Sequence, residues 1–193
     1  MAYDEPPFTV LRNDENFELR HYPSYVVAEL AVSSDYDDAG GVAFGPLARY
    51  IGGENIAYRE TPAGAPMTQL RSGIEIPMTA PVTQVAGKSG QHVVQFIMPA
   101  SFTLETTPKP NDSRIRIREI PERTLAVRRY SGRWTLSNLE REEGALREAL
   151  VHAQLEIVGA MEWARFNSPF SLPFLRRNEV WIPVAPPGDA PGS

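Results

Sequence analysis

The side chains best suited to hold a metal or move a proton near neutral pH are three histidines, His21, His92 and His152. They stand far apart in the chain and lack the short spacings of metal-ligand motifs, which argues against a zinc site. The sequence contains no cysteine, so disulfides, iron–sulfur clusters and thiol catalysis are excluded. His21 alternates with Phe17 and Leu19 in an expected strand, so the three side chains should share one face.

A second stretch that could bind a ligand is the apolar segment FNSPFSLPFLRR at residues 166–177. Its members include Phe170, Leu172, Phe174, Arg176 and Arg177, with two prolines and no helical or strand period. Such a loop is costly to leave exposed, so it either folds back onto the sheet or walls a ligand cleft. The guanidinium groups at its end can recognise carboxylates through paired hydrogen bonds.

Carboxylates on expected strands are the remaining candidates. Glu75, Glu119 and Glu179 would act as acids, bases or cation ligands only if they were buried. The sequence has no G-x-S-x-G elbow, no phosphate-binding glycine loop and no H-E-x-x-H motif. We therefore predict a binding protein rather than an enzyme.

Composition narrows the class of protein. Apolar residues make up 42% and charged residues 22%, with a net charge of −5, which is typical of a globular protein and lacks the basic face of nucleic-acid binders. No apolar stretch approaches a membrane span, and the first residues do not resemble a secretory signal. We expect a soluble, cytoplasmic protein with one domain at residues 1–184 and a flexible, Pro/Gly-rich tail at residues 185–193.

An internal repeat indicates how the elements are organised. FELRHYPSYVVAEL (residues 17–30) aligns without gaps with IRIREIPERTLAVR (residues 115–128), and both copies alternate apolar and polar residues around a proline. This pattern predicts two strands joined at a bend in each copy. We therefore expect two pseudo-symmetric halves, about residues 8–100 and 101–184.

A helical pattern follows each copy. The first has an apolar stripe of Phe44, Leu47, Ala48 and Ile51 with Pro46 in its first turn, and the second has a stripe that includes Leu139, Leu146 and Leu150. Strands are then expected at residues 74–77 in the first half and 180–183 in the second. The order strand, strand, helix, strand in each half predicts an α+β fold, a distorted antiparallel or mixed β-barrel with two flanking helices.

Several segments, taken in order, are similar to the SOUL haem-binding family. They are FELRHYPSYVVAE (17–29), RYIGGEN (49–55), IPMTAPV (76–82), FIMPASF (96–102), PKP (108–110), AVRRYSG (126–132) and RRNEVW (176–181). The resemblance spans about residues 8–184, and MTAPV and RRNEVW are its most specific parts. It implies a barrel of two pseudo-symmetric halves and reversible, non-covalent binding of haem and other porphyrins.

In this family the ligand is thought to lie in an open, mainly apolar cleft near the first helix and the loop before the last strand, without a shared axial ligand. The matching positions are Phe44, Leu47, Arg49, Ile51, Phe170, Leu172, Phe174, Arg176 and Arg177, the arginines facing the haem propionates. His21 is the candidate iron ligand. Some relatives carry a lysine in the late loop where this chain has Ser171 and Leu172, which puts one propionate contact in doubt.

The expected function is therefore that of a haem buffer or carrier. One alternative is an effector-binding module of the same duplicated type, with Glu75 or Glu179 at the base of a central pocket. Another is an enzyme that acts on a tetrapyrrole. A deep pocket with a buried glutamate would favour the effector-binding module over an outer cleft.

Overall fold

The computed structural model describes residues 3–59, 68–69, 73–87, 90–167 and 171–187. Its elements are β1 (Thr9–Asn13), β2 (Glu18–Tyr22), β3 (Tyr25–Val32), α1 (Tyr36–Ile51), β4 (Asn55–Ile56), β5 (Tyr58–Arg59), β6 (Thr68–Gln69), β7 (Val82–Ala86), β8 (His92–Ile97), β9 (Lys109–Pro110), β10 (Ile115–Ile120), β11 (Arg123–Tyr130), α2 (Leu136–His152), β12 (Glu162–Arg165), the 3-10 helix η2 (Pro173–Leu175) and β13 (Asn178–Val184). Residues 188–193 of the expected tail, and Phe170, lie outside the described residues.

Nine strands form one curled antiparallel sheet in the order β1-β2-β11-β13-β12-β7-β8-β3-β10. Apart from β1, which has no counterpart in the second half, the order of pairing is unchanged when β2, β3, β7 and β8 are exchanged with β10, β11, β12 and β13, respectively. Pro23 and Pro121 lie in the two short connections where β2 bends into β3 and β10 into β11. The α+β fold with two pseudo-symmetric halves and two flanking helices is thus confirmed.

The set of strands in each half differs from the prediction. Residues 74–77 form no strand, and β8 takes the place in the first half that β13 takes in the second. Each half also contains a further strand, β7 or β12, and these two pair with each other across the pseudo-symmetry. The alternation at residues 74–77 was misleading because only Ile76 is buried there, against the end of α1.

The start of α1 was predicted wrongly, and its buried face only in part, since Leu47 and Ile51 are buried as expected. The helix begins at Tyr36, so Pro46 lies inside it rather than in its first turn. Its buried stripe follows Ala39, Ala43 and Leu47, whereas Phe44 is 41% exposed. Ala39 and Ala43 are small and allow the helix to pack closely on the sheet. The prediction did not include them because it followed mainly large apolar residues.

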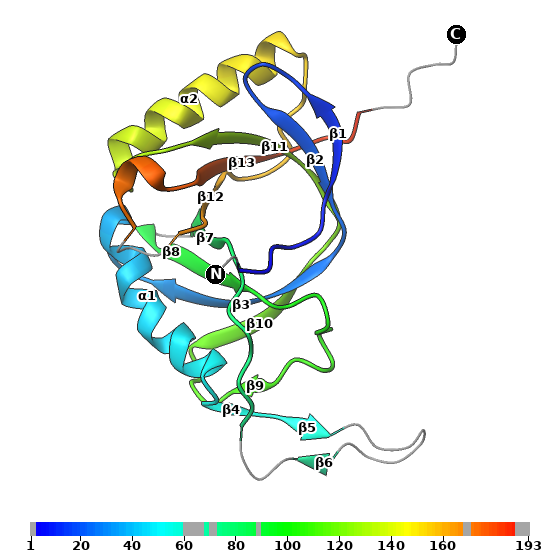
Figure 1. Ribbon diagram of the computed structural model, residues 1–193, viewed down its shortest axis with the longest axis vertical. Coiled ribbons are helices and arrows are strands. Elements are labelled where there is room, and N and C mark those ends of the chain that lie inside the picture. Colours follow the sequence, from blue (N-terminus) through cyan, green and yellow to red (C-terminus); the bar gives the residue numbers. More distant parts are fainter. Residues whose placement is uncertain (1–2, 60–67, 70–72, 88–89, 168–170, 188–193) are drawn as a thin grey trace, which may run out of the picture.

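Both helices lie on the outside of the curl, and the N-terminal end lies near its middle (Figure 1). One core cluster fills the space under α1, a second lies under α2, and a third lies inside the curl around Tyr22 and Trp181. The N-terminal segment closes part of the inner side, because Asp4 pairs with Thr79 and the Phe8 ring packs on Tyr22 at 5.2 Å. No helix among the described residues is long and apolar enough to cross a membrane.

Candidate functional site

The deepest charged group inside the curl is Glu179, on β13, whose side chain is fully buried. Its carboxylate accepts hydrogen bonds from Arg20 Nη1 at 3.0 Å, Arg177 Nε at 3.0 Å and Trp181 Nε1 at 2.7 Å. Burial, the largest single effect, lowers the pKa of Arg20, but the charge of Glu179 together with the contacts to Tyr22 and Glu18 raises the pKa overall. The carboxylate is therefore neutralised by the protein's own side chains.

This arrangement bears directly on the effector-binding alternative. A cationic ligand at Glu179 would have to replace Arg20 or Arg177, whose guanidinium groups already hold the carboxylate. Glu75, the other carboxylate considered, is exposed. With Glu179 already paired and Glu75 exposed, neither carboxylate matches the unpaired, buried glutamate that a cation-binding site of that type needs.

An open cleft of about 540 Å³ lies elsewhere, at the rim of the curl. It is lined by the N-terminal segment, the β2–β3 bend and the loop after β8, and its side chains include Asp4, Glu5, Tyr25 and Phe102. The volume lies within the range of about 300–1,000 Å³ for small-molecule pockets. The charged side chains that line it are Asp4 and Glu5, of which Glu5 pairs with Arg177, and the lining includes no arginine that could hold a propionate.

Several expected site residues cannot contact a ligand on the outer surface. Leu47 has no exposed area and Ile51 is only 8% exposed, because both lie in the core under α1. Arg177 points into the curl, where it pairs with Glu179 and with Glu5 at 2.7 Å. The structure thus corrects the assignment of Leu47, Ile51 and Arg177 to an outer site. Arg177 points inward because residues two apart on a strand share a face, and Glu179 faces the inside.

Other expected residues do lie on the surface. The late loop leaves Leu172, Phe174 and Leu175 between 55% and 69% exposed, so it does not fold back completely onto the sheet. Its backbone is fixed, because Gly132 N donates to Pro173 O at 3.0 Å. Phe44, on α1, keeps one edge exposed while its ring meets the buried Phe96 ring at 5.7 Å.

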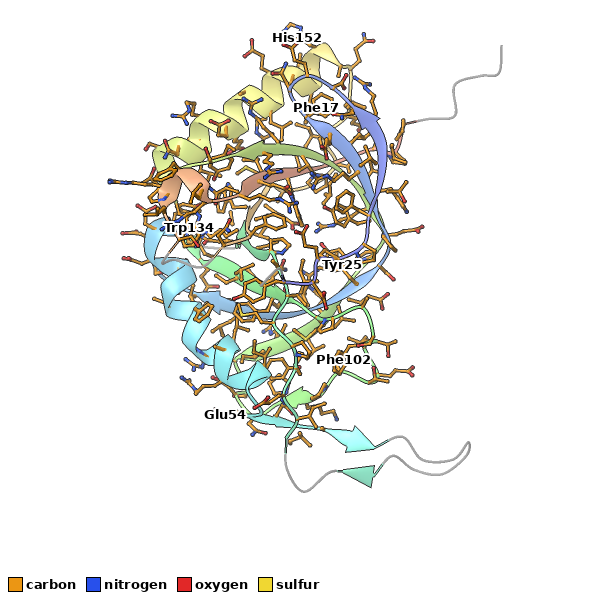
Figure 2. The ribbon with its side chains drawn as sticks, in the orientation of Figure 1. Phe17, Tyr25, Glu54, Phe102, Trp134 and His152 are labelled. Carbon is orange, nitrogen blue, oxygen red and sulfur yellow. The ribbon has the colours of Figure 1, made fainter. Side chains whose placement is uncertain are left out.

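Two arginines lie between α1 and this loop. The Arg165 guanidinium, on β12, lies 5.1 Å from the Trp134 ring and 5.4 Å from the Tyr36 ring at the start of α1. The Arg176 guanidinium lies 4.3 Å from the same Trp134 ring, and its Nε donates to Ser171 O at 2.9 Å. Trp134 thus links the start of α1 to the late loop, near both in Figure 2.

We call the surface formed by Phe44, Trp134, Arg165, Leu172, Phe174 and Arg176 the α1–loop face. Arg165 was missed in the sequence, although its alternation with Trp163 placed both on one strand face. A Cβ on Gly40 would lie 2.3 Å from Arg165 Nη1, so the guanidinium rests directly against α1. Phe44 lies one turn after Gly40, on the same edge of the helix as Arg165.

The remaining expected cation, Arg49, and two of the three histidines, His21 and His152, lie away from this face. Arg49 is exposed and pairs with Glu54 at 3.4 Å near the end of α1. His21 is half-buried on β2, between Thr9 of β1 and Thr124 of β11, on the side of the sheet that α2 covers. His152 is exposed at the end of α2. Among the described residues no group of three His, Asp or Glu side chains could hold a metal.

Residues from three of the family-like sequence motifs support the fold. Asn55, from RYIGGEN, donates to Tyr50 O and Ile74 O, both at 2.8 Å, and so ties the end of α1 to the chain before β7. Thr79, from MTAPV, donates to Ile97 O. Asn178, from RRNEVW, accepts from Trp134 Nε1 at 2.6 Å and positions that indole beside the loop.

Comparison with solved structures shows a shared fold at low identity. The C-terminal domain of EcmrR has 12% identity and a TM-score of 0.61, covering 92% of this chain and 98% of that one. A protein described as a hydrolase from Listeria innocua has 11% identity and a TM-score of 0.57, covering 91% of this chain and 94% of that one. EcmrR in complex with DNA has 12% identity and a TM-score of 0.59, and 56% of its length is covered.

A search of curated protein sequences gave no significant match. The family model described as SOUL heme-binding protein matches residues 3–183, nearly the whole of the chain. The order of the motifs and the two pseudo-symmetric halves agree with that match. The chain belongs to the SOUL heme-binding protein family.

Proposed function

We propose that this protein binds haem or a closely related tetrapyrrole non-covalently on the α1–loop face and acts as a haem buffer or carrier. The observation that carries the proposal is the joint presence of exposed Phe44, Leu172 and Phe174 with two arginines set against Trp134. A porphyrin needs broad apolar contact for its faces and cations for its two propionates. The family supports a haem ligand, and the face supplies both kinds of contact.

The magnitudes indicate that both kinds of contact are needed. Covering one large apolar side chain contributes about 1.5–3 kcal/mol, so three side chains that are roughly half exposed contribute about 3–5 kcal/mol. A micromolar dissociation constant requires about 8 kcal/mol after the costs of binding. Charge-assisted hydrogen bonds from arginine add about 1.5–3 kcal/mol each, which closes much of the gap.

Iron ligation has a small role in this proposal. His21 lies on the far side of β11 from the loop, so a macrocycle on the α1–loop face does not reach it. Metal-free protoporphyrin IX should therefore bind within about threefold of haemin, because a strong iron–histidine bond would separate the two ligands by a much larger factor.

The direct test is titration of the purified protein with haemin, followed by Soret absorbance and by quenching of tryptophan fluorescence. Phe174→Asp should weaken binding at least about tenfold, because it places a charge in the apolar part of the face. Val151→Asp is the matched control, since Val151 is 74% exposed on α2. Absence of saturable binding at micromolar haemin, or equal binding by Phe174→Asp, would overturn the proposal.

The role as a buffer or carrier predicts reversible loading. Bound haem should pass completely to an excess of apo-myoglobin, and protein and tetrapyrrole should be recovered chemically unchanged. A modified tetrapyrrole would instead indicate an enzyme. The structural neighbour described as a hydrolase shares only the fold at 11% identity and gives no support for catalysis here.

A further inference from the structure

Unpaired polar atoms gather at one place on the outer side of the sheet. Five buried side-chain atoms lack a hydrogen-bond partner among the described residues. Three of them, His92 Nδ1, Trp163 Nε1 and Arg165 Nε, belong to side chains around the start of α1. An unsatisfied buried donor costs about 1–3 kcal/mol, so a ligand that accepts hydrogen bonds from these donors would gain stabilisation here.

The three side chains are held rigidly around Tyr36, the first residue of α1. The Tyr36 ring meets the Trp163 ring edge-on at 4.6 Å and the His92 ring at 6.1 Å. Trp163 is only 7% exposed, and Arg165 stands two residues further along β12, on the same face. Trp163 and Arg165 are therefore alternate residues on the same face of one strand, and both contact Tyr36.

Arg165 is also short of negative charge. Its hydrogen-bond acceptor is Gln84 Oε1 at 3.0 Å, and no carboxylate in the described part of the chain forms an ion pair with it. The charge of Arg165 lowers the pKa of the Tyr36 phenol, whereas the charge of Asp37, in the first turn of α1, raises it. Burial, the largest effect, raises the pKa of Tyr36, so the phenol stays neutral and can donate to an anion.

We propose that Arg165 and the indole N–H of Trp163 form a binding subsite for a single carboxylate. Two adjacent donors, one of them charged, match the two oxygens of a carboxylate. The identity of this carboxylate rests on the proposed function, in which it is a propionate of the tetrapyrrole. A free organic acid has the same chemistry, so the subsite can be tested without any tetrapyrrole.

The first experiment follows the indole N–H signals of the ¹⁵N-labelled protein, with Trp163 assigned through Trp163→Phe. Butyrate should shift the Trp163 signal saturably, and neutral butyramide should not. Arg165→Gln should abolish the shift, and Arg49→Gln, which removes an exposed arginine away from the subsite, should retain it. No saturable shift with butyrate, as expected if an ordinary water satisfies these atoms, would overturn the subsite, as would an unchanged shift in Arg165→Gln.

Gly40 provides a second variant that keeps the arginine. Gly40→Ala places a methyl group where Arg165 Nη1 lies and should displace the guanidinium, so the butyrate shift should weaken severalfold. Gly41→Ala is the matched control, because a Cβ at Gly41 has nothing within 4 Å. Equal butyrate binding by both variants would contradict the placement of Arg165 in the subsite.

The second experiment joins the subsite to the proposed function. Wild-type protein should bind haemin about tenfold more tightly than haemin dimethyl ester, and Arg165→Gln should lose this preference. If neither tetrapyrrole binds while the butyrate shift persists, the proposed function fails and the subsite stands as one for another organic acid. If haemin and its ester bind equally to the wild type, the propionate assignment is wrong although tetrapyrrole binding holds.

Discussion

Replacing Glu179 by glutamine tests whether the interior of the curl depends on this buried charge. The side chain keeps its shape but loses its charge, while Arg20 remains only 5% exposed beside it. Breaking a buried ion pair by removing one partner costs about 3–5 kcal/mol. Arg20 keeps its pair with Glu18 at 2.7 Å, and Arg177 keeps its contact with Glu5 at 2.7 Å, so we expect the lower end, about 3 kcal/mol.

Urea denaturation at neutral pH measures this loss. With a denaturant slope of about 1–3 kcal/mol/M, the midpoint should fall by roughly 1–3 M while the slope stays the same. Glu143→Gln is the control, since it removes a helical ion pair with Arg147 at 2.7 Å whose arginine is 44% exposed. Exposed pairs of this kind contribute about 0.3–0.5 kcal/mol.

A loss below about 1 kcal/mol for Glu179→Gln would refute this reasoning, because it would mean that Arg20 finds water or another partner inside the curl. The same variant separates the two possible ligand sites. Haemin affinity should remain unchanged, since Glu179 faces the inside of the sheet and the α1–loop face lies outside it. A large change in haemin affinity in a folded variant would place the ligand inside the curl.

Three further outcomes follow from particular contacts. Gly41→Ala should raise the free energy of unfolding by about 0.5–1 kcal/mol in urea titrations, because alanine has the higher helix propensity. Gly40→Ala should raise it by less, because the added methyl group must displace Arg165. Equal gains from the two variants would contradict the contact between Gly40 and Arg165. Asn55→Ala should lower the free energy of unfolding by about 2–3 kcal/mol in the same assay, since buried backbone groups lose their partner; a loss within experimental error would contradict the tie between α1 and Ile74. Burial raises the pKa of Tyr22 to about 12, so the stability contributed by its neutral phenol is fully present below the ordinary pKa of 10.0 and is lost as the pH rises towards 12. Phenolate absorbance should then appear together with unfolding, and titration of all tyrosines near pH 10 in a folded protein would contradict the burial.

The sequence alone was sufficient for the fold class and its symmetry. The two repeat copies predicted the bent strand pairs around Pro23 and Pro121, because alternation and proline act locally. The stripe of Leu139, Leu146 and Leu150 predicted the buried face of α2 for the same reason. The start of α1 was missed because glycines and a proline lower its helix propensity, and packing against β3 and β8 overrides that preference.

The candidate site was only partly predictable. The apolar late loop and Phe44 could be identified as surface candidates, but the relevant arginines could not. Adjacent residues at the entry to β13 point to opposite sides, so Arg176 lies outside beside Trp134 and Arg177 lies inside beside Glu179. The sequence shows this alternation, but it does not show which side of the strand is the inside.

Arg165 depends entirely on the tertiary structure. Its strand, β12, is placed between β7 and β13, and only this pairing brings Arg165 beside Gly40 and Trp134, which are far away in the chain. The absence of a carboxylate partner for it in the described part of the chain is likewise a property of the assembled surface. Local periodicity thus determined the elements, whereas the charge and shape of the site arose from long-range strand pairing, which no local pattern encodes.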